Sequence, residues 1–396
     1  MSLLKALFAG YVILFSLNGL NTRPVKVPGV VVDYIPAAAK TYIGSPSICI
    51  LPDGSYLASH DHFGTGSSEH TRAVTSVFRS NDKGKHWEKI SEIQGQFWSN
   101  LFVHDDAVFI MGTWKHHGNF IIRRSDNGGH TWSEPADSIS GLLLSGEYHT
   151  APMPVVIHRG RIWRAVENAK SNTTEWGRRY GAMVISAPLA ADLLVAGNWT
   201  HSNFLPHDST FLEGNFRGWL EGNVVVDPEG NLLNILRVAT REKGRDMAAI
   251  VNVSDDGKTV AFDPAKGFID FIGGARKFTI RFDETSRRYW TICNMAGEEY
   301  SDLDAGSVRN TLVIKSSKDL INWTVHEILL HHPDVKKHGF QYIDWQFEGK
   351  DIIYVSRTAY DDNSGGANNY HDANYMTFHR IKNFRKLERK TIDKAY

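Results

Sequence analysis

The stretches that decide the fold are Ser80-Asn81-Asp82-Lys83-Gly84-Lys85-His86-Trp87 and Ser125-Asp126-Asn127-Gly128-Gly129-His130-Thr131-Trp132. Both approximate the pattern Ser-x-Asp-x-Gly-x-Thr-Trp, with His86 replacing Thr in the first and Asn127 replacing Asp in the second. An Asp or Asn at the third position accepts backbone N–H hydrogen bonds in a tight turn, and the glycine adopts a positive φ. The Trp is expected to pack between neighbouring sheets. We therefore interpret both stretches as structural turns without a catalytic role. Partial third and fourth copies are indicated by Asp255, Gly257 and Thr259, and by Ser316 with Trp323.

The rest of the chain repeats the same kind of unit. Helical periodicity is scarce, and short alternating apolar runs are bounded by Gly, Asp and Asn, which is typical of strands and tight turns. Hairpins begin near residues 46, 98, 149, 220, 275 and 342. This spacing predicts an all-β fold, a β-propeller of four-stranded blades, with six blades counted and seven possible. Val30 to Tyr34 is expected to close the last blade alongside Tyr375 to Ile381.

Length and composition limit the remaining possibilities. Residues 1–22 are interpreted as a signal peptide, because Lys5 precedes an apolar run from Ala6 to Leu17. Residues 23–396 are predicted to form a single domain that is exported to the periplasm or the extracellular space. No later run is apolar over the roughly 20 residues that a membrane span needs. The 44 basic and 44 acidic residues argue against a nucleic-acid partner. Cys49 and Cys293 lie in apolar runs and are expected to be buried free thiols.

Strand polarity predicts which residues face the working surface. The first two strands of each blade are expected to join at the Asp-Gly turns, on one face of the propeller. The beginning of each first strand and the end of each second strand then lie on the opposite face. Carboxylates and acid–base groups at those positions are the catalytic candidates: Tyr148, His149, Glu167, Glu221 and Asp344. Arginines clustered with aromatic residues suit a carboxylated sugar, because a guanidinium binds a carboxylate through two hydrogen bonds. The substrate-binding candidates are His60, His62, Trp114, His117, Arg164, Arg237, Arg276, Tyr342 and Arg357.

Each of these candidates also has a structural interpretation, since a strand-end Arg pairs with a neighbouring carboxylate at least as readily as with a substrate. No metal site or other cofactor is expected. The pairs His116-His117 and His331-His332 lack the spacing of zinc ligands. Calcium is an alternative for the oxygen-rich loop of Asp361, Asp362, Asn363 and Asp372, but a solvated loop is favoured there.

The repeated turn motifs make the chain similar to the sialidase-like, or BNR-repeat, superfamily over nearly all of its length. Sialidases usually carry Arg-Ile-Pro in the first blade, whereas Gly44-Ser45-Pro46-Ser47 stands here. The segments starting at Tyr42, Ala58, Tyr148 and Trp219 resemble glycoside hydrolase family 145 and related rhamnose–glucuronate lyases. That resemblance implies a glycan with L-rhamnose linked to glucuronic acid, such as arabinogalactan, and Tyr148, His149 and Arg164 would suit the lyase roles by type.

Three functions follow from these observations. The first is an enzyme that cleaves a rhamnose–uronate linkage of an acidic oligosaccharide or polysaccharide, by hydrolysis or by β-elimination. The second is an exo-sialidase that uses Glu, Tyr and an Arg cluster. The third is a catalytically inactive propeller that binds glycans, because a fold does not determine a function.

Overall fold

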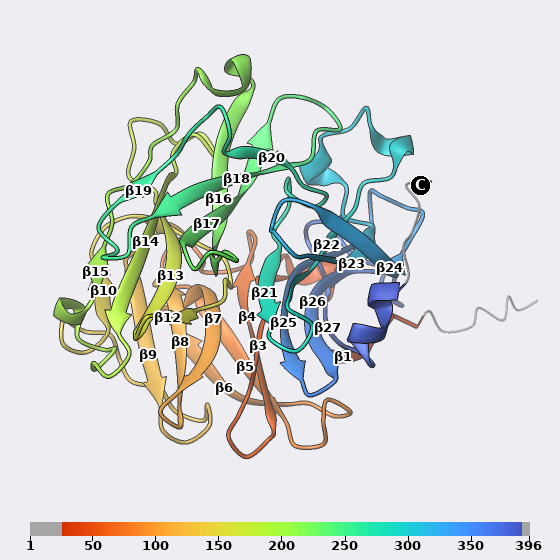
Figure 1. Cartoon of the computed structure of the whole chain (residues 1–396). Coiled ribbons are helices and arrows are strands. Elements are labelled where there is room, and N and C mark those ends of the chain that lie inside the picture. The colour runs from red at the N-terminus through yellow and green to blue at the C-terminus, as the bar shows by residue number, and fades with distance from the viewer. Residues whose placement is uncertain (1–25, 390–396) are drawn as a thin grey trace, which may run out of the picture.

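The computed structural model describes residues 26–389, and the expected signal peptide at residues 1–22 lies outside them. The described residues form six antiparallel sheets arranged around a central axis, which is a six-bladed β-propeller (Figure 1). The predicted all-β propeller is confirmed, with six blades in the described chain and not seven.

The first three blades follow one another along the chain. Blade one contains β2 (Tyr42–Ile43), β3 (Ser47–Ile50), β4 (Tyr56–Phe63), β5 (Val74–Ser80) and β6 (Glu88–Gln94). Blade two contains β7 (Phe97–His104), β8 (Ala107–Thr113), β9 (Phe120–Ser125) and β10 (Leu142–Leu144). Blade three contains β11 (Tyr148–His149), β12 (Val156–His158), β13 (Arg161–Asn168), β14 (Gly181–Pro188) and β15 (Thr200–His201).

The last three blades complete the ring. Blade four contains β16 (Phe216–Val226), β17 (Leu232–Thr240), β18 (Met247–Val253), β19 (Val260–Ala261) and β20 (Phe268–Asp270). Blade five contains β21 (Thr279–Asp283), β22 (Arg288–Asn294), β23 (Thr311–Ser317) and β24 (Trp323–His331). Blade six contains β25 (Gly339–Glu348), β26 (Asp351–Ala359), β27 (Tyr375–Ile381) and β1 (Val30–Tyr34). Short 3-10 segments are η1 (Ala37–Ala39), η2 (Ala196–Asn198), η3 (Phe211–Gly214), η4 (Glu298–Tyr300), η5 (Ala305–Ser307) and η6 (Phe384–Arg389).

The ring closes by joining the beginning of the described chain to its end. β1 pairs antiparallel with β27, with Val30 opposite Phe378 and Tyr34 opposite Tyr375. This confirms the strand pairing predicted from the sequence. Closure leaves β1 as the outer strand of blade six and connects two segments that are more than 300 positions apart in the sequence.

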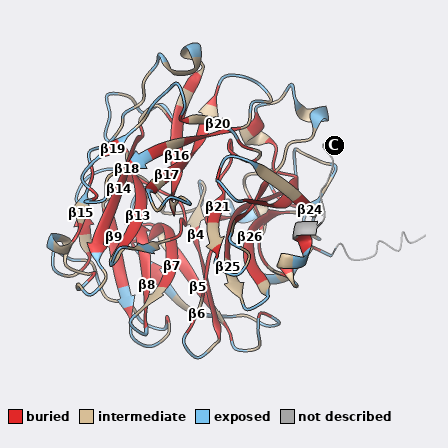
Figure 2. Ribbon diagram, in the orientation of Figure 1, coloured by how far each residue is buried: buried red, intermediate tan, exposed pale blue. Residues whose placement is uncertain are grey.

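The hydrophobic core is divided among the interfaces between neighbouring blades. Phe102, Phe109 and Phe120 of blade two, for example, pack against Ile162 and Ile185 of blade three. Equivalent clusters lie between the other neighbouring blades, and Figure 2 shows the buried residues concentrated along the strands. Because every blade contributes to two such layers, the blades stabilise one another and the axis is held as one scaffold.

The motif-bearing turns connect the third and fourth strands of their blades. Asp82 accepts hydrogen bonds from the backbone N–H groups of Lys85 (3.0 Å) and His86 (2.9 Å), and Asn127 accepts one from Thr131 (2.9 Å). Lys83 donates to the carbonyl oxygen of Gly54 at 2.9 Å. The motif turn of blade one therefore lies beside the Asp-Gly turn between its first two strands, on the face where the sequence analysis placed both.

Two details of the weaker motif copies differ from the sequence interpretation. In the third copy, Asp256 and not Asp255 accepts from Ser254 and Lys258, because the turn is one residue shorter. In the fourth, Ser317 and Asp319 make the turn bonds, and Ser316 instead pairs with His326 at 2.8 Å.

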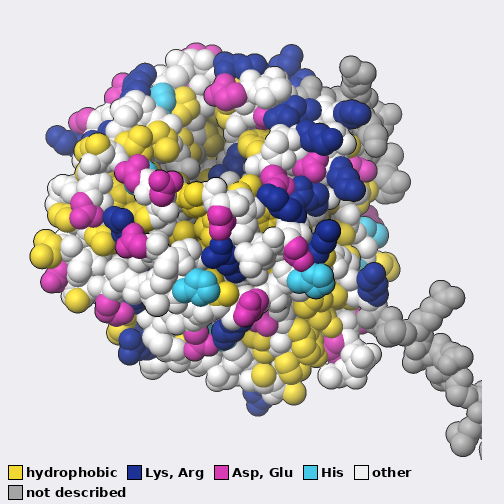
Figure 3. Space-filling model, turned by 90° about the horizontal axis from the view of Figure 1, so that it is seen from below, with side chains coloured by type: hydrophobic (Ala, Val, Ile, Leu, Met, Phe, Trp, Pro, Cys, Tyr) yellow, Lys and Arg dark blue, Asp and Glu magenta, His cyan; other side chains and the backbone are white. Residues whose placement is uncertain are grey.

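The cysteines, the hydropathy of the helices and the surface charges also bear on the sequence predictions. Cys49 and Cys293 are both buried and free, as predicted. No helix among residues 26–389 has the length and hydropathy to cross a membrane. On the face shown in Figure 3, basic and acidic side chains are interspersed.

Candidate active site

Three equivalent positions near the propeller axis have unusual backbone geometry. Trp98, Glu221 and Tyr342 lie within β7, β16 and β25, the innermost strands of alternate blades, and their φ angles are 48°, 54° and 54°. At each position the strand register is interrupted by a bulge. A positive φ costs free energy for a residue with a side chain, and β-bulges redirect side chains near functional sites. These positions indicate which face of the propeller carries the candidate site.

Two of these strained residues contact each other across the axis. The hydroxyl of Tyr342 donates to Glu221 Oε1 at 3.0 Å, and Arg237 Nη1 lies 3.1 Å from Glu221 Oε2. Burial alone would raise the pKa of Glu221, but the charges of Arg237 and His149 and the two hydrogen bonds outweigh it, so this pKa lies below its usual value. Burial, reinforced by the Glu221 charge, raises the pKa of Tyr342. The pair is therefore a carboxylate next to a neutral phenol whose proton it can accept.

Three guanidinium groups surround Tyr342. Arg357 and Arg309 lie over its ring at 5.0 Å and 5.7 Å, and Arg237 reaches the same carboxylate as the Tyr342 hydroxyl. Arg309 is 6% exposed and Arg357 3% exposed. Burial lowers the pKa of Arg309 to about 10 and also lowers that of Arg357.

The arginines retain unused hydrogen-bonding capacity. Arg357 donates through Nε and Nη2 to the carbonyl of His371, and Arg309 donates to the Gly306 carbonyl and to Gln341. Within the described chain, neither Arg309 nor Arg357 has a carboxylate within 4.0 Å, while Glu221 pairs only with Arg237. A buried guanidinium without a counter-ion is costly, so an anion bound beside Arg309 and Arg357 would be stabilised there.

A cavity of about 270 Å³ opens next to these residues. Tyr342 and Arg357 line it together with Asp61 and Phe63 from the end of β4, and Arg357 lies over the Phe63 ring at 4.3 Å. Asp61 is buried, Ser45 N donates to its Oδ1 at 2.9 Å, and Oδ2 has no hydrogen-bond partner among the described residues. Burial raises the pKa of Asp61 to about 7. A carboxyl group in this state can donate a proton near neutral pH.

Aromatic side chains form the remaining wall of the cavity. Trp98, Trp176 and His116 line it, and Trp98 contacts Trp176 and His116 with ring centroids 6.3 Å and 4.6 Å apart. Trp176 is 41% exposed. Exposed aromatic faces beside a polar cavity suit the apolar faces of sugar rings.

A second cavity, about 560 Å³ and therefore larger, opens among the turns of the opposite face. Its lining is mixed: Val155, Ile157 and Phe282 line it together with Arg281, Arg287 and Lys318. We take the smaller cavity as the candidate active site, because the strained Tyr342, the buried Asp61 carboxyl group and the Arg357 guanidinium group all line it.

His149 and Glu167, both catalytic candidates from the sequence, form a buried pair behind this wall. His149 Nδ1 lies 2.8 Å from Glu167 Oε2, and Glu167 Oε1 accepts from Gly222 N at 3.1 Å. Glu167 thereby holds the bulge that contains Glu221. Tyr148 instead packs into the hydrophobic layer between blades two and three. None of the three lines the cavity.

The carboxylate of Asp344 connects blade six to blade one. It accepts from Ser47 Oγ at 2.7 Å and from Ile48 N at 3.0 Å, and Arg281 lies 3.3 Å away. Its acceptor positions are filled by protein donors, so the structure places it in the scaffold.

The histidine and tryptophan side chains that were predicted to bind substrate lie around the site but do not line the cavity. His60 is buried and lies 2.8 Å from Asp33 Oδ2, and His62 pairs with Ser76 at 3.0 Å. His117 contacts the Tyr180 hydroxyl at 2.9 Å, and burial lowers its pKa. Trp114 is half-buried against Gly95, where a Cβ atom would lie 2.2 Å from the indole nitrogen.

The four predicted arginines divide into two pairs. Arg237 and Arg357 meet at Tyr342. Arg164 is fully buried on Asn100 and the carbonyls of Ala151 and Ala165, and Arg276 is buried against Asp246. These last two do not reach the cavity.

Asp61 and Arg309 were not singled out from the sequence. Asp61 stands between His60 and His62 at a strand end that the polarity argument had already placed on this face. Arg309 lies two residues before β23. Extending the same polarity argument to the starts of third strands would have identified it.

No protein-family model matches the chain. A sialidase of Paraclostridium sordellii is 22% identical over 243 residues, or 55% of this chain and 53% of that protein, so the chain spans about half the length of this relative. Among solved structures, a protein of unknown function from Dyadobacter fermentans matches with a TM-score of 0.60 at 14% identity, covering 90% of this chain and 100% of that one.

Two structures of named enzymes are also similar. An α-L-arabinanase of Penicillium chrysogenum has a TM-score of 0.55 at 13% identity, covering 93% of this chain and 100% of that one. A sialidase of Trypanosoma rangeli has a TM-score of 0.53 at 14% identity, covering 88% of this chain and 55% of that one. At these identities the structural likeness shows the fold alone. With the six-bladed architecture, the matches fit a sialidase-like propeller superfamily.

Proposed function

We propose that this protein is a glycoside hydrolase that acts on an acidic sugar and uses Tyr342 as its nucleophile. The observation that carries this proposal is the hydroxyl of Tyr342 on the buried Glu221 carboxylate, within a cluster of three guanidinium groups. Sialidases are glycosidases with a tyrosine nucleophile, so this pair has a known chemical precedent. The sialidase and arabinanase among the similar proteins support a carbohydrate substrate.

The geometry supports a two-step reaction that retains configuration. Tyr342 Oη attacks the anomeric carbon while its proton passes to Glu221, and Asp61 gives a proton to the departing glycosidic oxygen. A water molecule then attacks the same carbon, with Asp61 taking its proton, and the tyrosyl bond breaks as the proton on Glu221 returns to Tyr342.

The guanidinium cluster determines the substrate class in this proposal. Arg309 and Arg357 lack carboxylate partners among the described residues, so a sugar carboxylate replaces the missing counter-ion. A terminal sialic acid meets this requirement. So does L-rhamnose linked to glucuronic acid, the substrate that the sequence resemblance implies, with the arginines then holding the glucuronate. Export of the protein, as expected from residues 1–22, would bring it to such glycans.

The test is turnover by purified protein of residues 23–396 on three substrates: a sialyl oligosaccharide, a glucuronide and a rhamnosyl-glucuronate oligosaccharide. Released sugar is measured together with the ultraviolet absorbance of an unsaturated uronate, and the Tyr342→Phe variant gives the background. Release that depends on Tyr342 supports the proposal and identifies the sugar. Absorbance without hydrolysis would assign a lyase instead. Binding by calorimetry without any turnover would assign a glycan-binding propeller.

A further inference from the structure

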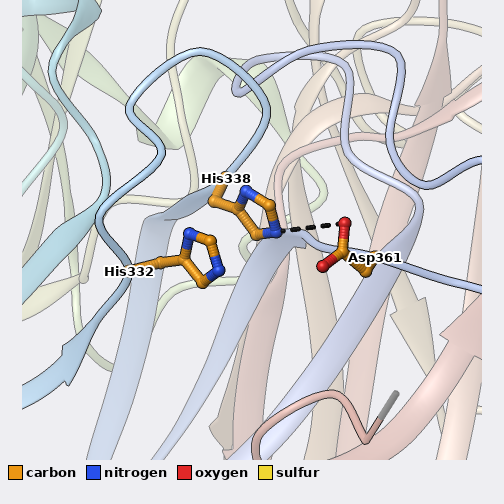
Figure 4. A group of neighbouring side chains, drawn as sticks. All are labelled: His332, His338 and Asp361. Carbon is orange, nitrogen blue, oxygen red and sulfur yellow. Dashed lines mark ion pairs between the residues drawn. The ribbon is translucent and has the colours of Figure 1, made fainter. Parts of the chain in front are cut away.

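A second group of chemically reactive side chains lies outside the proposed catalytic centre. His332 and His338 come from the connection between β24 and β25, and Asp361 follows β26 (Figure 4). One donor atom from each residue lies within 4.8 Å of the other two. Two imidazole nitrogens and a carboxylate oxygen form a donor set that zinc and related divalent metals prefer.

His338 is the unusual member of this group. It is 3% exposed, yet neither ring nitrogen has a hydrogen bond within the described part of the chain. Asp361 Oδ1 lies 3.4 Å from its Nε2, and Asp334 Oδ2 lies 3.5 Å from its Nδ1. The rings of His338 and His332 stack with centroids 3.4 Å apart. Buried polar atoms normally find partners, so this arrangement calls for a ligand.

We propose that His332, His338 and Asp361 bind a divalent transition metal ion, with zinc as the reference ion. His338 Nε2 and Asp361 bind it directly, and Asp334 orients His338 from its other ring nitrogen, which is the usual arrangement around a metal-bound histidine. In the structure, His332 Nδ1 accepts the backbone N–H of Asp334 at 3.1 Å. To bind the ion, the His332 ring rotates away from this hydrogen bond. Water completes the coordination, since the Asp361 side chain is 51% exposed.

The position of this site gives the ion a structural role. The loop that follows Asp361 carries Tyr370 and His371, and the backbone N–H of Tyr370 donates to the carbonyl of Lys336 at 2.8 Å. His371 lines the catalytic cavity, and its carbonyl accepts from Arg357. An ion that joins the two loops therefore secures one wall of the cavity. The metal site itself does not depend on the proposed glycosidase activity.

The test is titration of metal-free protein with Zn²⁺ by calorimetry, and with Co²⁺ by its visible absorption. We expect one equivalent of either ion to bind and Tm to rise on binding. His338→Gln and Asp361→Asn are each expected to weaken binding by at least about tenfold, and Asp334→Asn by about tenfold. His331→Gln is the matched control, because exposed His331 contacts Thr311 at 2.9 Å and lies outside the cluster.

The circular dichroism of each metal-free variant shows whether it folds. Asp361→Asn serves as the main variant, since its exposed side chain makes misfolding the least concern. Absence of stoichiometric binding to the wild-type protein would overturn the proposal. Equal affinity of folded Asp361→Asn and wild-type protein would also overturn it.

Discussion

The proposed reaction needs a neutral nucleophile beside a cluster of positively charged side chains. If the substrate is a sialic acid, its carboxylate lies next to the reacting carbon and a carboxylate nucleophile would repel it. In this proposal Tyr342 avoids that repulsion because it stays a neutral phenol until it attacks, and the negative charge lies on Glu221, 3.0 Å from the Tyr342 hydroxyl. The strained φ of both residues costs on the order of 1–3 kcal/mol each, which the surrounding scaffold must offset.

Replacing Tyr342 by Phe should lower kcat by about 10³-fold or more, because it removes the attacking oxygen while leaving the ring packed. Steady-state kinetics on the preferred substrate measures this loss. Tyr148→Phe is the matched control and should retain activity, since Tyr148 packs between blades. Equal losses in both variants would argue against the assignment of Tyr342.

The pH dependence should reflect Asp61, whose pKa burial raises to about 7. Asp61 donates a proton only in its acid form, so kcat/KM should fall as pH rises above about 7, by about tenfold per unit well above that value. In Asp61→Asn this decline should disappear. The variant should be much less impaired on aryl glycosides, whose leaving groups need little protonation. A decline that persists in Asp61→Asn would assign it to another group.

Among the strands, the bulged inner ones carry both candidate site residues and contacts between blades. Glu221 points to the axis, and Asn223 on the same strand accepts from Ile280 N at 3.0 Å and donates to the Phe278 carbonyl at 3.2 Å in the next blade. Asp344 has the equivalent position after Tyr342 and bonds Ser47 and Ile48 of blade one. A bulge thus lets one strand direct one side chain to the candidate site and another to the neighbouring blade.

Asn223→Ala should lower the free energy of unfolding by about 2–4 kcal/mol, because it leaves buried backbone groups of blade five without partners. Urea denaturation followed by fluorescence measures the change. Asn231→Ala, in an exposed turn where the side chain bonds only Asp227, should cost less than about 1 kcal/mol. Similar losses in the two variants would mean that Asn223 does not couple the blades.

In the whole molecule, the pairing of β1 with β27 closes the ring and joins six sheets, each of low stability alone, into one scaffold. Without β1, the outer edge of β27 is unpaired, and the apolar layer between blades six and one loses Val32. An open sheet edge also favours association between chains.

A variant that begins at Pro36 should therefore have a Tm lower by about 10 °C or more, or should aggregate. A variant that begins at Lys26 keeps β1 complete and should melt like the full chain. Calorimetry and size-exclusion chromatography distinguish these outcomes. Equal Tm values for the two variants would show that closure contributes little.

Strand alternation and turn chemistry are local properties, so the architecture of this protein could be predicted from its sequence. The repeated hairpins predicted six blades, and the apolar run Val30 to Tyr34 predicted the closing strand. Strand polarity also placed Glu221, Arg237, Tyr342 and Arg357 on one face. Which of these residues come into contact with one another depends on the tertiary structure. Tyr342 and Glu221 are 121 positions apart, and the bulges that direct them toward each other leave no local signal.

The arginines show the same division between local and non-local information. Arg164, Arg276, Arg309 and Arg357 are all buried, but protein acceptors surround the first, Asp246 pairs with the second, and the last two have no carboxylate partner within the described chain. Whether a buried charge is satisfied by the protein or left for a ligand depends on neighbours that are distant in sequence. The candidate site therefore depends on how the blades pack around the axis, while the residue types that form it can be found in the sequence.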